Sequence, residues 1–503
     1  MYILKENEAG DIHMSEMSIR DAFSEIGPEF NFAPLGELLQ PFIKQVLVQQ
    51  GKAMYRAGTL LVPTLMVWLV LALTLRRDLS YPHLLNWMLS GFRWLEGIVP
   101  AMTDLVQDGA ISHARVKLGW ALFRDLLRAM MATQSALEPD FQGRISLIFD
   151  GSTGTMPDTE PNQERFAKPS SRRHTAAFPQ VRMMALCSLS VRLILEIAYA
   201  PYRGKGSGER ALVREILDNL RRMTAPFLFL MDAGLYAFDL LWEMRERGED
   251  FLIKVPATVK FKVQKRLSDG SYLSALTHKV ADIEAGLSPS GRQHWKTVSL
   301  VVRVIDVHIP GFRPHRLVTS LLEEEIAARE LALHYHQRWD VEIAYDEIKT
   351  HQCATLRGQS PTTFRSKRPD LVIQELYAML IVYNAIRLII AQAAHSQDKD
   401  PRSLSFLDAL QHMIDAAPIV TALSSDRRQE RFQHLLQLIA HSDIDRPRRP
   451  RLNPRVVKLK MSKFTRKHLI HRCQERNIAK ELKIIPPPPD IRSPSSTPAL
   501  LST

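Results

Sequence analysis

The sequence contains few cysteines and no segment that is typical of secretion. Cys187, Cys353 and Cys473 are its three cysteines among 503 residues, and their wide spacing suits neither a disulfide framework nor a cysteine-based zinc site. The first residues, MYILKENEAGDIHMSEMS, lack the charged and then apolar pattern of a signal peptide. These absences predict a reducing, cytoplasmic environment.

Long hydrophobic runs are also scarce. Residues 58–75, GTLLVPTLMVWLVLALTL, approach the roughly 20 residues that a membrane span needs. Pro63 and three threonines interrupt this run. We therefore expect a buried helix that begins near Pro63, with a membrane span as the alternative.

Excess charge is confined to one segment. Residues 446–483 contain fourteen Lys and Arg but only two acids, Glu475 and Glu481. This excess of positive charge equals the formal net charge of the whole chain, +12. A concentrated basic segment is typical of polyanion binding, and the lack of an apolar stripe there favours nucleic acid over a membrane. The alternative is a basic tail that serves solubility alone.

Residues up to about 140 have helical patterns, and short apolar strands follow from Arg144. Two of these strands end at an acid: RISLIFDGST at Asp150 and APFLFLMDAG at Asp232. Further strands are expected at 181–190, 193–199 and 251–256, with helices at 207–222 and 236–248. This order predicts an α/β fold with a ribonuclease-H-like core, in which both acids reach the same edge of the sheet.

A β-rich insertion and a helical, basic C-terminal region complete the expected organisation. The predicted parts are a helical N-terminal domain that is a candidate for DNA binding (1–140), the first part of the catalytic core (141–256), the β-rich insertion (257–320), the second part of the core (321–400), the helical basic region (401–485) and a disordered tail (486–503).

One helix is expected over residues 331–350, LALHYHQRWDVEIAYDEIKT, which contain no Gly or Pro. At about 100° per residue, Tyr335, Arg338, Glu342 and Lys349 fall within an arc of roughly 60° on one side of it. Such a stripe is ordinarily a solvated charged face. A carboxylate flanked by cations and a phenol also suits a metal ion beside a phosphate, and both interpretations stay open at this point.

Two further acids would give Glu342 partners of the same chemistry. Metal-assisted phosphodiester chemistry requires carboxylates that converge on two hard divalent cations, roughly 3.5–4 Å apart. Asp150, Asp232 and Glu342 would supply them. Each Asp alone is also explained as a turn residue at a strand end, but the two together with the helix favour a metal-binding catalytic centre.

Four fixed residues then point to a family. The spacing Tyr335-HQ-Arg338-WDV-Glu342-IAYDEI-Lys349 matches the Tyr-Arg-Glu-Lys signature of one group of bacterial insertion-sequence transposases with a DDE triad. The chain resembles this group, the insertion sequence four family, over about residues 30–400.

Other blocks agree with the resemblance. DGS at Asp150, followed by PDT and Asn162, is similar to the family's first catalytic block, and QELYAMLIVYNAIR at 374–387 is similar to the helix after the signature. The second block usually reads Asp-Arg-Gly and then an aromatic residue. Here it reads DAGLY from Asp232, with Ala233 in the place of the arginine.

The resemblance implies cut-and-paste transposition through a hairpin intermediate. The three acids would bind two Mg²⁺ ions, for which Mn²⁺ can substitute, while Tyr335, Arg338 and Lys349 would grip DNA phosphates, as their hydrogen-bonding chemistry allows. The implied partners are the terminal inverted repeats of the element, target DNA and a second copy of the chain in a synaptic complex. The protein would act in the cytoplasm at the nucleoid, without a membrane partner.

Trp295 is the candidate for holding a flipped base. In relatives a Trp of the β insertion stacks on a base when the hairpin forms, and Trp295 begins the strand pattern WKTVSLVVRV. The alternative is a Trp packed inside a small β core.

Two other functions stay open from the sequence. One is a DNA-binding protein without catalysis, which only Ala233 favours. The other is a ribonuclease-H-like nuclease without strand transfer, which would need neither the Tyr-Arg-Glu-Lys helix nor the β insertion.

Overall fold

The computed structural model of the chain divides into two compact units, Met1–Phe227 with Arg338–Pro447 and Leu228–Gln337 with Arg448–Thr503. Each unit is described below by itself. The structure describes residues 2–6, 12–16, 30–56, 59–91, 106–132, 137–170, 176–204, 206–220, 225–281, 295–310, 312–352, 354–355, 358–359, 362–444, 451–452 and 476–487. Most of the basic segment 446–483, and the tail from residue 488 onward, lie outside this part.

The N-terminal part of the first unit is helical, as predicted. Its helices are α2 (Leu35–Gln49), α3 (Pro63–Ala72), α4 (Tyr81–Met88), α6 (Asp108–Leu118) and α7 (Ala121–Ala132). Pro63 opens α3, whose residues from Leu65 to Ala72 are all buried, so the expectation of a buried helix there is confirmed. Gly119, with a φ of 72°, separates α6 from α7.

Three antiparallel strands follow in the first unit, in the order β5-β4-β3. They are β3 (Ile145–Thr155), β4 (Gln180–Ser188) and β5 (Ile194–Pro201), and the helices α8 (Glu160–Phe166) and α9 (Glu209–Leu220) follow β3 and β5 respectively. The expectation that Asp150 ends its strand is wrong. Asp150 pairs with Ala185, and the ladder continues to the pair of Thr155 and Gln180, because β4 keeps accepting partners beyond the acid.

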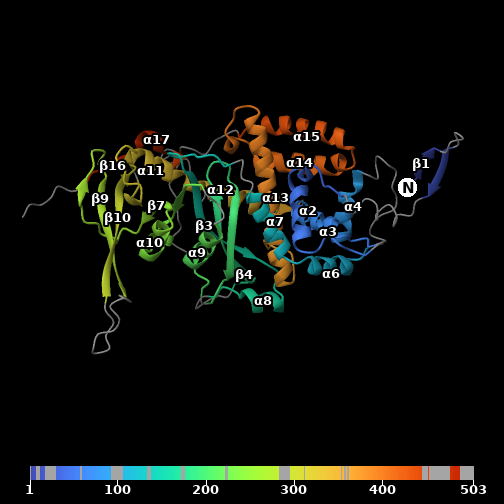
Figure 1. Ribbon diagram of the computed structural model, residues 1–503, viewed down its shortest axis with the longest axis horizontal. Helices are drawn as coiled ribbons and strands as arrows, with labels where there is room; N and C mark the ends of the chain where they lie inside the picture. Colours follow the sequence, from blue (N-terminus) through green and yellow to red (C-terminus); the bar gives the residue numbers. More distant parts are fainter. Residues whose placement is uncertain are drawn as a thin grey trace, which may run out of the picture. The chain divides into compact units, whose positions relative to one another are not determined.

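The long helix α13 (Pro369–His395) forms the centre of the first unit, among α2, α3, α7, α14 (Phe406–Thr421) and α15 (Ser425–Ala440) (Figure 1). It is the one described helix with the length and composition to cross a membrane, but 83% of its apolar window is buried inside the protein. Helices surround it, and the side-chain amide of Asn384 links it to β5. This amide accepts from the main-chain N–H of Ile194 at 2.9 Å and donates to the main-chain oxygen of Ile194 at 2.8 Å.

The second unit contains a mixed sheet in which β6 and β7 are parallel and the other strands are antiparallel. Its strands, in sheet order, are β6 (Phe227–Met231), β7 (Asp250–Val255), β11 (His315–Thr319), β10 (Trp295–His308), β9 (Tyr272–Ala281) and β8 (Lys265–Arg266), with β16 (Lys483–Ile485) paired to β10. The helices α10 (Phe238–Glu246), α11 (Ala328–His336) and α17 (Ile478–Glu481) accompany this sheet.

The remaining described elements are short. They are β1 (Tyr2–Glu6) paired with β2 (Ile12–Glu16), β12 (Ala354–Thr355) paired with β13 (Gly358–Gln359), β14 (Arg451–Leu452) paired with β15 (Arg476–Asn477), and the 3₁₀ turn η5 (Pro401–Ser403). Both units together make the chain a mixed α/β protein.

The stretch predicted as one helix is helical throughout but changes its type three times. After α11, the chain forms a 3₁₀ turn, η3 (Gln337–Trp339), then α12 (Asp340–Asp346), then a π-helical segment, η4 (Glu347–Gln352). The boundary between the two units falls between Gln337 and Arg338. The expectation of one regular helix with four residues on one side is therefore corrected: Tyr335 belongs to one unit, and the other three signature residues belong to the other.

Candidate active site

Asp150 lies in the middle of β3, on a strand whose next residues are small. Its side chain is 25% exposed. Gly151 follows, and a Cβ placed there would lie only 2.9 Å from Oε1 of Glu209 on α9. A larger residue at this position would therefore push Glu209 away, which explains the glycine without any reference to turn formation.

The signature segment of the first unit docks onto this part of β3. A guanidinium nitrogen of Arg338 lies 3.8 Å from a carboxylate oxygen of Asp150, and the hydroxyl of Tyr345 donates to the main-chain oxygen of Asp150 at 2.8 Å. Burial, and then the nearby Asp150 carboxylate, raise the pKa of Tyr345 well above its usual range, so this hydroxyl stays protonated and keeps donating.

Lys349 extends the same contact one step along β3. Its ammonium donates to the hydroxyl of Ser152 at 2.5 Å and to the main-chain oxygen of Thr153 at 2.8 Å. It also lies over the ring of Tyr345, 5.6 Å from the ring centre. Arg338, Tyr345 and Lys349 together fix which side of α12 and η4 faces the strand.

Glu342 follows Arg338 by four residues and precedes Tyr345 by three, and residues with these spacings are neighbours on a helix surface. Both neighbours contact Asp150. We therefore expect Glu342 on the side of α12 that is directed toward β3. Unlike Arg338, which is 4% exposed, Glu342 is exposed, and its carboxylate is available to a ligand.

The opposite side of the signature segment is held by a buried ionic network. Asp340 forms an ion pair with Arg192 at 3.5 Å. Glu347 forms ion pairs with Arg192 at 3.4 Å and with Arg387 at 3.6 Å. Tyr383 donates to the other oxygen of Glu347 at 2.9 Å. These contacts lie on the reverse of Glu342, so they oppose rotation of α12 away from β3.

Asp232 and Tyr335 lie close together in the second unit. Asp232 follows β6 directly, as predicted; it is exposed, and its carboxylate makes no capping bond to the 3₁₀ turn η2 (Ala233–Leu235). The hydroxyl of Tyr335 donates at 3.0 Å to the main-chain oxygen of Met231, the residue before Asp232. Tyr335 is 6% exposed, so in this structure it braces the strand end that carries Asp232.

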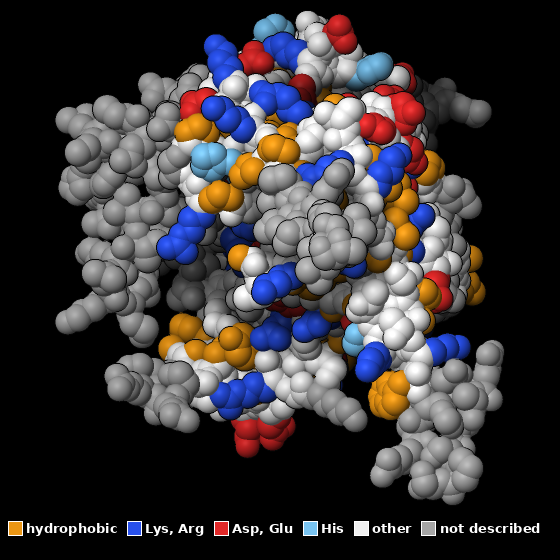
Figure 2. All heavy atoms as spheres, turned by 90° about the vertical axis from the view of Figure 1, so that its left-hand side faces the viewer, with side chains coloured by type: hydrophobic (Ala, Val, Ile, Leu, Met, Phe, Trp, Pro, Cys, Tyr) orange, Lys and Arg blue, Asp and Glu red, His pale blue; other side chains and the backbone are white. Residues whose placement is uncertain are grey.

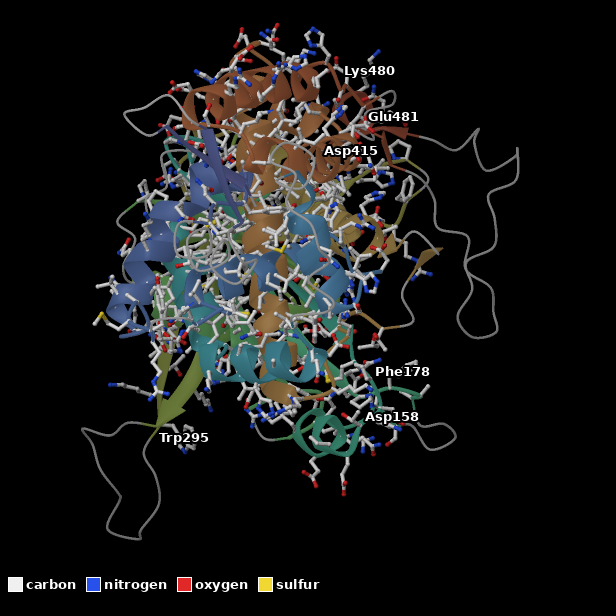
Figure 3. All side chains as sticks on the ribbon, turned by 90° about the vertical axis from the view of Figure 1, so that its right-hand side faces the viewer. Asp158, Phe178, Trp295, Asp415, Lys480 and Glu481 are labelled. Atoms are coloured by element: carbon white, nitrogen blue, oxygen red, sulfur yellow. The ribbon has the colours of Figure 1, made fainter. Side chains whose placement is uncertain are left out.

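Trp295 lies at the far end of the β9–β10 ribbon, where it pairs with Ala281 (Figure 3). Its side chain is 62% exposed. The alternative of a Trp packed inside a β core is therefore wrong, because the ribbon extends past the part of β10 that is buried.

The acids of the first unit suit a hard divalent cation. Asp150 and Glu342 offer carboxylate oxygens, which Mg²⁺ prefers, from two elements that contact each other. Within the described part of either unit, no group of three or more His, Cys, Asp or Glu side chains lies close enough to hold a metal ion. Asp150 and Glu342 belong to one unit and Asp232 to the other.

In the first unit, Asp150 on β3 and the exposed Glu342 on the docked signature segment are candidate groups for metal-assisted phosphodiester chemistry. Comparison with known proteins gives the class. Residues 142–385 match the family described as "Transposase DDE domain", and residues 31–128 match the family described as "Insertion element 4 transposase N-terminal". The chain therefore belongs to the DDE transposases of insertion element 4 type, which confirms the resemblance drawn from the signature.

One relative covers nearly the whole chain. Transposase InsG for insertion sequence element IS4 of Escherichia coli (strain K12) is 26% identical over 438 residues, which are 86% of this chain and 92% of the relative. A solved structure, the piggyBac transposase synaptic complex with hairpin DNA, is 9% identical with a TM-score of 0.41 and covers 82% of this chain and 85% of that chain. A similarity of that size says nothing further about this chain.

This membership makes the protein an insertion-sequence transposase, an enzyme that binds, cleaves and recombines DNA. It also implies that the enzyme depends on a divalent metal ion.

Figure 2 shows Lys and Arg side chains spread over one face of the molecule, interspersed with Asp and Glu. Among the described side chains drawn there, no single basic patch dominates. The basic segment that the sequence singled out lies largely outside the described residues, so its part in DNA binding stays a prediction.

The structure adds contacts that the sequence had not singled out. Tyr345 anchors α12 to Asp150, and Glu347 anchors η4 to buried arginines. The spacing of Tyr345, three residues after Glu342, was a usable signal, because it places the ring beside the carboxylate. Nothing local marks Glu347 as buried, since its partners come from distant parts of the chain.

Proposed function

We propose that the chain moves its own insertion sequence by a cut-and-paste reaction, with Asp150, Asp232 and Glu342 as one catalytic triad. The observation that carries this proposal is the docking of the signature segment on β3: Arg338 and Tyr345, four residues before and three residues after Glu342, both contact Asp150. We assign Asp150, Asp232 and Glu342 to a ribonuclease-H-like core. Residues 257–320 form a β-rich insertion within this core.

Two Mg²⁺ ions held by the three carboxylates would activate the attacking oxygen and stabilise the leaving oxygen of the phosphodiester. Water attacks the phosphodiester at the transposon end and frees a 3′ hydroxyl. This hydroxyl attacks the opposite strand, which closes a hairpin on the transposon end and releases the flanking DNA. Hydrolysis of the hairpin restores the 3′ hydroxyl, which then attacks a phosphodiester of the target DNA.

The other signature residues position the DNA. Arg338 and Lys349 carry the charge that neutralises phosphate, and Tyr335 can donate a hydrogen bond to it. Their present contacts, with Asp150, Ser152 and the chain at Met231, would be exchanged for phosphates near the terminal nucleotides. Support comes from the contacts of Arg338 and Lys349 with β3, at Asp150 and at Ser152 respectively.

Trp295 provides a surface for a flipped base. An exposed indole at the end of a two-stranded ribbon can stack on a base that hairpin formation forces out of the duplex. The exposed fraction of 62% supports this role, because a large apolar side chain is otherwise costly to leave in water.

The remaining partners follow from the same reaction. We propose that two copies of the chain pair the inverted repeats of the element in a synaptic complex, and that the basic segment 446–483 contacts DNA. The protein would act in the cytoplasm on nucleoid DNA, without a membrane partner.

A DNA-binding protein without catalysis is the second candidate. Ala233 favours it, because this residue stands where the family has an arginine after the second acid, and its methyl group cannot contact phosphate. If this reading holds, Ala233→Arg would restore cleavage that the natural chain lacks.

A cleavage assay on labelled transposon ends with Mg²⁺ tests the proposal. The natural chain should nick and then form hairpins, and Glu342→Gln should do neither. Asp346→Asn is the matched control, since Asp346 is an exposed acid on the same helix and, among the described residues, its side chain accepts a hydrogen bond from Thr350. Equal products from Glu342→Gln and the natural chain would refute the proposal.

A further inference from the structure

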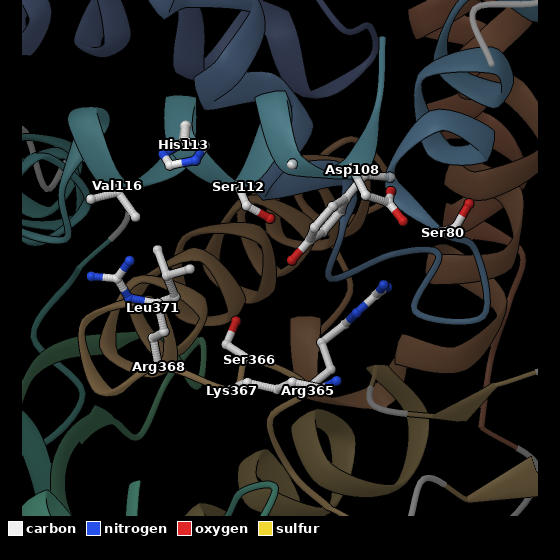
Figure 4. A pocket seen from close by; sticks show the side chains of 12 residues that line it. Ser80, Asp108, Ser112, His113, Val116, Arg365, Ser366, Lys367, Arg368 and Leu371 are labelled. Carbon is white, nitrogen blue, oxygen red and sulfur yellow. The ribbon is translucent and has the colours of Figure 1, made fainter. Parts of the chain in front are cut away.

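A cavity in the first unit combines positive charge with hydrogen-bond donors. Its volume is about 460 Å³, and it lies between α6 and the segment that leads into α13. Figure 4 shows Ser112 and His113 of α6 along one wall and Arg365, Ser366 and Arg368 along the other. No catalytic residue of the proposed triad lines this cavity.

A buried arginine without a carboxylate partner lies beneath the cavity. Arg115 is 0% exposed, yet its guanidinium donates only to neutral groups: the side-chain oxygen of Gln374 at 2.9 Å, the hydroxyl of Tyr81 at 2.6 Å, and Ser366 and Leu371 at 3.3 and 3.5 Å. Within the described part of the chain it makes no ion pair. Burial of an uncompensated charge costs several kcal/mol, so the site gains when an anion approaches.

A second arginine repeats this arrangement at the wall of the cavity. The guanidinium of Arg365 lies over the ring of Tyr81, 5.2 Å from the ring centre, and the hydroxyl of the same Tyr81 accepts from Arg115. Arg365 also donates to the main-chain oxygens of Arg77 and Leu79 at 3.2 and 2.8 Å. Burial, opposed by Tyr81 and Glu375, lowers the pKa of Arg365, and the positive charges of Arg115 and Arg77 add to this lowering. Two guanidiniums thus share one aromatic ring, and each bonds neutral groups.

The rim of the cavity carries further cations that face solvent. Lys367 and Arg368 are both exposed, and neither pairs with an acid among the residues that the structure describes. Asp108, at the start of α6, is the one carboxylate among the described lining residues. The N-termini of α4, α6 and α13 also meet here, and the main-chain N–H groups at a helix N-terminus favour anions.

We infer that this cavity is a docking site for backbone phosphates of duplex DNA, separate from the catalytic centre, with Lys367 and Arg368 as the contacts that face the duplex and Arg115 and Arg365 as the buried charge beneath them. The inference rests on the proposed function for the identity of the DNA. The contact between the N-terminal helices and α13 would then serve DNA binding.

β3 fixes the distance between this site and Asp150. Phe364 donates to the main-chain oxygen of Thr155 at 2.9 Å, so the segment that carries Arg365 begins where β3 ends. Thr155 follows Asp150 by five residues, which is roughly 17 Å at the rise of a strand, and the three or four residues from Phe364 to Lys367 and Arg368 add up to about 14 Å. At about 3.4 Å per nucleotide along the duplex, the site would contact phosphates roughly five to nine nucleotides from the cleaved bond.

Salt-dependent binding to a duplex of the transposon end tests the inference. The measurement uses the full chain with Glu342→Gln, so that the duplex stays intact. Each lost phosphate contact reduces the slope of log K against log salt by about 0.9, so Lys367→Ala with Arg368→Ala should reduce it by about 1.8. The charge-keeping pair Lys367→Arg with Arg368→Lys should preserve the slope.

The matched control removes equal charge elsewhere. Arg427 and Arg431 are exposed on α15, and their double alanine variant should keep the natural slope. Neutral methylphosphonate linkages roughly five to nine nucleotides from the cleaved bond should reduce the slope for the chain with the natural Lys367 and Arg368 but cause no further reduction in the double alanine variant. An unchanged slope in that variant, or an equal loss in the α15 control, would overturn the inference. Cleavage by the natural chain is measured separately, so failure of the proposed function would be visible by itself.

Discussion

Glu347→Gln is the substitution that most directly tests how the signature segment is held. Glu347 is the carboxylate that pairs with Arg387, whose side chain is 0% exposed, and it also accepts from Arg192 and Tyr383. The glutamine side chain has the same shape as glutamate and still accepts the hydrogen bond from Tyr383, but it lacks the negative charge. Within the described residues Arg387 then has no carboxylate partner, while Arg192 still pairs with Asp340.

Loss of one partner of a buried ion pair costs about 3–5 kcal/mol. The first unit has roughly 340 residues, and an unfolding entropy of about 2.1 cal/mol/K per residue then gives roughly 0.7 kcal/mol per degree. The Tm of the first unit should therefore fall by about 4–7 °C. Calorimetry of the full chain measures this shift.

Glu342→Gln is the control, because it makes the same chemical change on the same segment at an exposed position. Its free energy of unfolding should change by less than about 0.5 kcal/mol. Equal Tm values for Glu347→Gln and Glu342→Gln would show that the buried network does not hold the segment, and the reasoning from burial would fail.

Three further predictions concern the second unit and the basic segment. Trp295→Ala should keep nicking but reduce hairpin formation on a labelled transposon end, while Trp295→Phe keeps both; normal hairpin yield from the alanine variant removes the role. Burial and the charge of Lys254 lower the pKa of His315 to about 4. The unfolded chain therefore binds more protons than the folded chain between about pH 6.5 and 4, and the free energy of unfolding falls as the pH drops through that window. In urea unfolding, His315→Gln should reduce the dependence of this free energy on pH, and an unchanged dependence would refute the prediction. Replacement of the seven Lys and Arg in residues 453–475 by Gln should flatten the salt dependence of DNA binding, and an unchanged slope would exclude this segment as a DNA contact.

The structure alters the design of that last experiment. Residues near the C-terminal end of the basic segment belong to the second unit, because β16 pairs with β10 and Arg329 donates to the main-chain oxygen of Ala479 at 2.8 Å. Deletion of all of residues 446–483 would remove these contacts. Substitution between 453 and 475 removes charge and leaves them intact.

Much of the order of elements could be predicted from local patterns. The buried helix at Pro63, the strand that ends before Asp232 and the long apolar helix after the signature all appear where the sequence placed them. Each is marked by residues within its own length: a proline at a helix start, an apolar run closed by an acid, or a run too long for a strand.

Features that depend on distant partners could not be predicted in this way. β3 runs past Asp150 because β4 supplies hydrogen-bond partners as far as Thr155. The helix type changes around α12 with no Gly or Pro to mark it, since Arg338 and Lys349 must reach β3 while Glu347 reaches buried arginines on the other side. The docking of Tyr345 has the same origin.

The central proposal is that the carboxylates of Asp150, Asp232 and Glu342 act together in catalysis, and the cleavage rates of the single and combined variants test it most directly. Asp150→Asn, Asp232→Asn and Glu342→Gln should each reduce cleavage of the transposon end to the same background, and the triple variant should be no slower, because residues that act as a unit are not additive. Cleavage that survives in any one single variant, or losses that multiply in the triple variant, would contradict the account.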